Sequence, residues 1–137
     1  MLRRDEKLNI IRQEAYSLIK KCDYDNGILK LIEAGQRESD ANSTVGHFAE
    51  HRKDFQNAIK FYTKSNTYFA LQSLAKIYEK MNKLEDAAQF SELSISKANG
   101  NKPEAIARTI SLYKKAKNIK KLEELAEKYD KPREFPF

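Results

Sequence analysis

The chain has 137 residues, enough for one domain with a single hydrophobic core, and its 40% hydrophobic and 34% charged residues are typical of helix-rich soluble proteins. Its 26 basic and 20 acidic residues leave a formal net charge of +6, a modest excess that favours a solvated mixed-charge surface over a concentrated polyanion site. Cys22 is the only cysteine, which excludes an internal disulfide, and the chain lacks both a signal-peptide core and a membrane-length apolar run, so we expect a cytoplasmic protein without membrane insertion.

From residue 4 onward, apolar residues recur with the 3.6-residue period of amphipathic helices, and no segment shows the alternation of a strand. Gly35 and Pro103 are favourable helix-end and helix-start residues, and the polar segment 36–43 is the longest expected loop. The sequence therefore predicts an all-α fold in a single domain, residues 1–131, with a short tail at 132–137. The expected helix hairpins cover about residues 4–35, 44–65, 68–98 and 103–130.

One hairpin pattern recurs along the chain. Its starting positions are 31, 29 and 35 residues apart, at Leu18, Ala49, Tyr78 and Tyr113. Six residues later stands an apolar residue expected to fold back beneath the turn, at Tyr24, Phe55, Leu84 and Ile119. Where paired helices cross most closely, small residues are needed, and the pattern supplies them at Gly46, Ala58, Ala75 and Ala87. Such a period indicates stacked helix pairs and favours binding over catalysis.

These positions resemble a known repeat family. The large, large, small, aromatic and second small positions of the tetratricopeptide-repeat (TPR) consensus are matched by Leu71, Leu74, Ala75, Tyr78 and Ala87. The preceding unit repeats the spacing with Gly46, Ala58 and Tyr62. No Trp opens a repeat and no Pro closes one at the usual place. In this irregularity, and in the amino-acid sequence of residues 46–50 and 55–71, the chain is similar to the solenoid tails of intraflagellar-transport (complex A) and coat-type trafficking subunits.

The resemblance implies a right-handed α-solenoid of about four antiparallel hairpins that acts as a non-enzymatic protein–protein interaction scaffold, in the cytoplasm or the cilium. The β-propellers that usually precede such tails are absent, which suggests a fragment or a reduced homologue. The expected partners are other protein subunits or peptides, held by polar residues of the first helices. These predicted contact residues are Arg12, His47, Glu50, His51, Gln72 and Lys76. A solenoid end carrying Leu8, Ile11 and Leu18 offers a surface for a homodimer.

Other functions remain open at this point. A basic face could bind RNA or another polyanion through Lys114, Lys115, Lys117, Lys120 and Lys121, although Glu123, Glu124 and Glu127 follow and offset its charge. His47, Glu50 and His51 form an H-x-x-E-H motif of the kind that holds zinc, but no third histidine follows them. Without a phosphate loop or a catalytic set, we expect no enzyme activity, no cofactor and no metal. The tail residues Phe135 and Phe137 either cap the last hairpin or insert into a partner.

Overall fold

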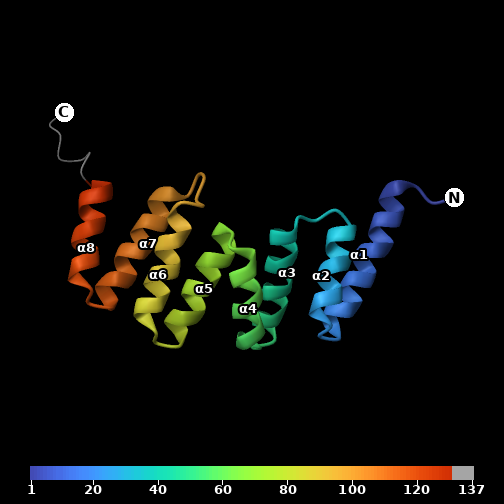
Figure 1. The fold of residues 1–137 in the computed structure, drawn as a ribbon, viewed down its shortest axis with the longest axis horizontal. Coiled ribbons are helices and arrows are strands. Elements are labelled where there is room, and N and C mark those ends of the chain that lie inside the picture. Colours follow the sequence, from blue (N-terminus) through green and yellow to red (C-terminus); the bar gives the residue numbers. More distant parts are fainter. Residues whose placement is uncertain (131–137) are drawn as a thin grey trace. The chain divides into compact units, whose positions relative to one another are not determined.

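The computed structural model describes residues 1–130, which contain helices and turns and no strand (Figure 1). This confirms the all-α prediction. The helices are α1 (Arg4–Lys20), α2 (Tyr24–Glu33), α3 (Glu38–His51), α4 (Phe55–Ser65), α5 (Tyr68–Lys80), α6 (Leu84–Ile95), α7 (Lys102–Lys115) and α8 (Ile119–Leu125), followed by the π-helical segment η1 (Ala126–Asp130). The tail, with Pro132, Phe135, Pro136 and Phe137, lies outside the described residues.

The chain divides into two compact units, which we call unit 1 (Met1–Ala70) and unit 2 (from Leu71 onward). In unit 1, α1 packs on α2, α2 on α3, and α3 on α4; in unit 2, α6 packs on α7, α7 on α8, and α8 on η1. Packing of successive helices is consistent with a helical-repeat fold. Among the described residues, no helix combines the length and apolar character that crossing a membrane requires.

The same turn follows each of the four starting positions. The residue four positions later takes a left-handed conformation, at Cys22, Lys53, Asn82 and Lys117, with φ of 66°, 62°, 59° and 59°. The next N–H then donates to the starting residue's carbonyl, as from Asp23 to Leu18 and from Asp54 to Ala49, both at 2.9 Å. These are the Schellman bonds that satisfy the last carbonyls of a helix. The predicted spacing therefore coincides with a recurring turn that follows α1, α3, α5 and α7.

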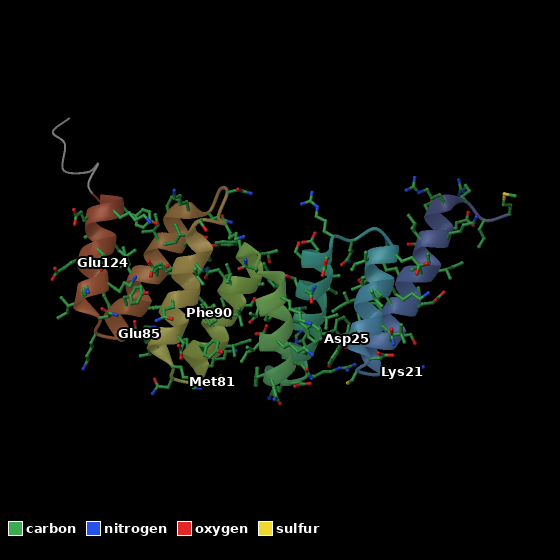
Figure 2. The ribbon with its side chains drawn as sticks, viewed as in Figure 1. Lys21, Asp25, Met81, Glu85, Phe90 and Glu124 are labelled. Carbon is green, nitrogen blue, oxygen red and sulfur yellow. The ribbon has the colours of Figure 1, made fainter. Side chains whose placement is uncertain are left out.

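The four small residues that the sequence predicts at helix crossings are all buried. Ala58 and Ala87 are fully buried and Ala75 is 3% exposed. A Cβ added at Gly46 would lie 2.8 Å from Cδ1 of Tyr62, so the tyrosine ring fills the space that the glycine leaves. In unit 2, Tyr78 stacks on Phe90 at a ring-centroid distance of 5.3 Å, beside the core that contains Ala75 and Ala87 (Figure 2 labels Phe90).

The expected loop at residues 36–43 is wrong, because α3 already begins at Glu38. The segment contains no glycine or proline after Gly35, and Asn42 and Ser43 form hydrogen bonds in the helical conformation, although Asn42 Oδ1 is buried without a partner. Asn42 Nδ2 donates to the Glu38 carbonyl, and the Ser43 hydroxyl lies 2.6 Å from the Ser65 hydroxyl. Hydrogen bonds thus allow a polar helix face to be buried where hydropathy predicts a loop.

The residues expected to fold beneath the turns do so unevenly. Tyr24 is 6% exposed and its ring packs edge-on against Phe61 at 5.6 Å. Phe55 is 37% exposed and Ile119 is 67% exposed, so neither locks its turn. Each of these residues opens the second helix of its pair, where a side chain is buried only if a partner such as the Phe61 ring reaches it.

Candidate protein-binding grooves

Unit 1 contains a groove of about 480 Å³ with mostly apolar walls, formed by α1, α3 and the first turn of α5. We call it the aromatic groove. It is lined by Tyr16, Ser43, Thr44, His47, Phe48 and Phe69. Tyr16 approaches Phe48 at a centroid distance of 6.1 Å, and His47 approaches Phe69 at 6.2 Å. Phe69 is nevertheless 52% exposed, so a large apolar side chain is held at the surface.

A cluster of hydroxyl groups positions Phe69 in the groove. The Ser43 hydroxyl lies 2.6 Å from that of Ser65 and 3.2 Å from that of Thr67, which joins α3 to the turn before α5. Thr67 also accepts a hydrogen bond from the Ala70 N–H at 3.2 Å, as a capping residue at a helix start does. Tyr62 supports the Phe69 ring from the neighbouring helix, with the two centroids 6.0 Å apart. The hydroxyl cluster and the Tyr62 ring therefore hold the exposed Phe69 side chain in position.

The H-x-x-E-H residues lie beside this groove. His47 and His51 are exposed, with ring centroids 5.0 Å apart, while Glu50 accepts a hydrogen bond from the Tyr62 hydroxyl at 2.7 Å. The carboxylate is thus committed to the α3–α4 pair. Among the described side chains, up to Tyr129, no group of three or more His, Cys, Asp or Glu residues is placed to hold a metal ion.

Arg52 connects α3 to the first turn, a role that the sequence analysis missed. Its guanidinium donates to the carbonyls of Ile19 and Lys20 at 3.2 and 2.9 Å, and to the Cys22 sulfur at 3.0 Å. It also lies 6.0 Å from the centre of the Phe48 ring, a cation–π contact. One arginine thereby fixes the distance between the two helices that form the wall of the aromatic groove. Neither hydropathy nor spacing marks this residue, because its acceptors are backbone carbonyls some 30 positions away.

Unit 2 contains a smaller groove of about 210 Å³ between α5 and α7, which we call the polar groove. It is lined by Gln72, Ala75, Lys76, Glu79, Arg108, Ser111, Leu112 and Lys115. Polar bonds cross from one wall to the other: Lys115 Nζ lies 2.7 Å from Glu79 Oε2, and Arg108 Nη1 donates to Gln72 Oε1 at 3.0 Å. The lining of this groove contains no aromatic ring, and its apolar residues are Ala75 and Leu112.

The two grooves use the same positions of the repeat. Two residues before the starting position stand Tyr16 and His47 in the aromatic groove, but Lys76 and Ser111 in the polar groove. One residue before it, Phe48 corresponds to Leu112. Equivalent backbone positions thus carry different chemistry in the two units.

A third hollow, of about 630 Å³, lies in unit 2 beside α6, α8 and η1. Its floor includes Tyr113, whose hydroxyl donates to Glu92 at 2.6 Å. Burial, and then this hydrogen bond, raise the pKa of the Tyr113 phenol. Lys121 Nζ lies 3.5 Å from a carboxylate oxygen of Glu92 and of Glu124. The pKa of Lys121 is raised, and the largest cause is the negative charge of Glu92. Two lysines of the basic stretch, Lys115 and Lys121, are therefore paired with carboxylates.

The structure distributes the six predicted contact residues unequally. His47 lines the aromatic groove, with Glu50 and His51 beside it, and Lys76 lines the polar groove; Arg12 contacts Asn9 within α1. Gln72 is only 5% exposed and donates to Ser94 at 2.6 Å, so this side chain is occupied inside unit 2. Tyr16, Phe48 and Phe69 line a groove but had been assigned to no site.

Compared with known proteins, the chain matches no family model, and no curated protein matches it significantly.

Proposed function

We propose that the protein is a non-enzymatic protein–protein interaction module that holds a partner segment in the aromatic groove of unit 1. The supporting observation is the exposed Phe69, which stands opposite His47 in a groove of about 480 Å³. Large aromatic side chains that are fixed before binding commonly supply most of an interface's affinity, because they lose little conformational freedom when they are covered.

The groove suits a peptide or helix better than a small metabolite. Its walls are side chains of α1, α3 and the start of α5, and its polar groups are the hydroxyls of Ser43, Thr44 and Tyr16 and the imidazole of His47. The Ser43 hydroxyl is engaged with Ser65, and Thr44 Oγ1 donates to the Asp40 carbonyl at 3.0 Å. Few directed polar groups therefore remain to select a small polar ligand, whereas apolar side chains of a protein segment would bury the aromatic rings.

The wider proposal is a right-handed, TPR-like α-solenoid of four hairpins, acting as a subunit or fragment of a trafficking assembly such as intraflagellar transport complex A, in the cytoplasm or cilium. The recurring turn and the small residues at helix crossings support this architecture. The pathway depends on the sequence resemblance alone. Polyanion binding through Lys114–Lys121 is less well supported, because Lys115 and Lys121 already face carboxylates.

The experiment is an affinity capture from an extract of the source organism, with the intact chain and two variants as bait. Phe69→Ser removes the groove aromatic, and Leu29→Ser is the matched control, because Leu29 is 63% exposed on α2 outside the groove. We expect Phe69→Ser to lose the captured protein by a factor of about 30 or more, as for a hot-spot residue, and Leu29→Ser to retain it. Equal capture by Phe69→Ser, or recovery of nucleic acid alone, would contradict the proposal.

A further inference from the structure

A buried polar network occupies the centre of unit 2. Gln72 Nε2 donates to Ser94 Oγ at 2.6 Å and lies 3.4 Å from Ser91 Oγ, and the Ser91 and Thr109 hydroxyls are 2.8 Å apart. Gln72 is 5% exposed and the other three residues are fully buried. The network joins α5, α6 and α7, and every hydroxyl in it has a partner, so the Gln72 amide is fixed in one orientation.

The network reaches the surface at one side chain, Arg108. Gln72 Oε1 accepts a hydrogen bond from Arg108 Nη1 at 3.0 Å, at the floor of the polar groove. A guanidinium carries five N–H donors, and this bond uses one of them. Among the side chains that the structure describes, up to Tyr129, no carboxylate forms an ion pair with Arg108. A buried amide therefore holds an exposed arginine in place, although no anion of the described chain compensates its charge.

Two further cations line the same groove. Lys76, on α5, forms no ion pair with the described residues, while Lys115, on α7, pairs with Glu79 at 2.7 Å. Together with Arg108, the lining carries three cations and one carboxylate. The Ser111 hydroxyl lies in the same lining and adds a hydrogen-bond donor. The polar groove thus presents a positioned planar fork and a net excess of two positive charges.

We propose that the polar groove binds the phosphoryl group of a phosphorylated side chain, with the Arg108 guanidinium as a bidentate donor and Lys76 as the flanking cation, while Lys115 stays paired with Glu79. A phosphoryl group carries close to two negative charges at neutral pH, which match the two excess positive charges of the groove. Its three oxygens can accept hydrogen bonds from Arg108, Lys76 and Ser111. That the group belongs to a protein partner rests on the proposed function. The anion site itself does not, because it lies in unit 2 and is testable without that partner.

The test is an NMR titration of the intact ¹⁵N-labelled chain. The probes are phenyl phosphate, an alanine-rich peptide with one phosphoserine, its unphosphorylated form, and a uridine decamer. We expect the two phosphorylated small probes to shift the Arg108 side-chain N–H signal and the amides around Lys76 and Ser111. Arg108→Lys keeps the charge but loses the fork, and should weaken binding of the phosphopeptide by about tenfold. Lys76→Ala should weaken it several-fold, while the matched control Lys114→Ala, on α7 outside the groove, should leave it unchanged.

Three results would overturn the proposal. Phenyl phosphate and the phosphopeptide could both leave the Arg108 and Lys76 signals unmoved. Lys114→Ala could weaken binding as much as Arg108→Lys, which would mean a diffuse positive surface. The uridine decamer could bind while both small probes fail, which would assign the surface to a polyanion. None of these results bears on Phe69, so failure of the anion site is distinguishable from failure of the aromatic groove.

Discussion

The aromatic groove of unit 1 and the polar groove of unit 2 are built on equivalent positions but differ in what they leave unsatisfied. In the polar groove, Arg108 bonds to Gln72 and Lys115 bonds to Glu79, so the two walls hold each other. In the aromatic groove, the hydroxyl bonds lie at the base and Phe69 remains half exposed above them. The turns and small residues are common to both units, whereas the side chains that line each groove differ in chemistry.

The largest expected effect tests whether the two units share one framework. Ala58 and Ala87 are equivalent and fully buried, so Ala58→Arg and Ala87→Arg each force an unpaired charge into a helix crossing. We expect each to lower the free energy of unfolding by more than about 3 kcal/mol. Hydrogen exchange should show lost protection in unit 1 for Ala58→Arg and in unit 2 for Ala87→Arg. Ala107→Arg, at an exposed position on α7, is the control. A cooperative melt at the wild-type temperature for either buried variant would refute the shared register.

A smaller change sharpens the account of the aromatic groove. In Gly46→Ala, the new Cβ would lie 2.8 Å from the Tyr62 ring, which in turn supports Phe69. Overpacking costs about 1–3 kcal/mol, and the better helix propensity of alanine returns about 1 kcal/mol. Chemical denaturation should therefore show a net loss of about 1 kcal/mol, and the aromatic NMR signals of Phe69 should shift. Gly100→Ala, where nothing lies within 4 Å of the added Cβ, should change neither.

A third prediction concerns pH and belongs to unit 2. Burial and the bond to Glu92 raise the pKa of Tyr113 above its usual 10.0, so folding favours the neutral phenol. That contribution is complete below about pH 10 and is lost as the pH rises through the folded-state value. Tyr113→Phe should cost about 1 kcal/mol at neutral pH and then lose less stability than the wild type on going to pH ~11. Parallel alkaline melting curves of the two proteins would show that Tyr113 does not contribute.

The smallest expected effect addresses the turn that both units share. Lys53 and Lys117 hold left-handed conformations that cost a residue with a Cβ about 1 kcal/mol. Lys53→Gly and Lys117→Gly relieve this strain but enlarge the freedom of the unfolded chain, so each should stabilise the protein by about 0.5 kcal/mol. Thermal melting would detect the gain. Lys114→Gly, inside α7, should instead destabilise by about 1 kcal/mol. A stabilised turn in only one unit would show that the two turns are not equivalent.

The sequence predicts the features that depend on local spacing. The stripe of apolar residues and the small residues at Ala58 and Ala87 follow from helix geometry alone, and the turns after the four starting positions lie where the spacing predicts. Ser43 and Gln72 were misplaced because their partners are distant: Ser65 and Thr67 in one case, Ser94 and Arg108 in the other. When the partner of a polar residue is distant in the sequence, hydropathy predicts that the residue is exposed, because hydropathy takes no account of its hydrogen bonds.

The groove residues show the same limit from the opposite side. Phe48 and Phe69 are large apolar residues of the kind expected in a core. Only the arrangement of α1, α3 and the start of α5 makes them line a surface groove. Polar residues on the first helix of each hairpin were predicted as partner contacts because contact residues are usually sought among exposed polar side chains. Of these predicted contacts, His47 lines the aromatic groove and Lys76 lines the polar groove, whereas the aromatic rings around His47 were not predicted as contacts.

The first turn offers a spectroscopic handle on these helices. Cys22, the only thiol of the chain, is exposed, and its sulfur accepts hydrogen bonds from Arg52 at 3.0 Å and from the Tyr24 hydroxyl at 3.6 Å. A nitroxide or fluorophore attached there needs no other residue removed and displaces the guanidinium that spans α1 and α3. Because Cys22 is exposed, a probe attached there is accessible at the turn beside α1 and α3, and a ligand seated in the aromatic groove should change its signal.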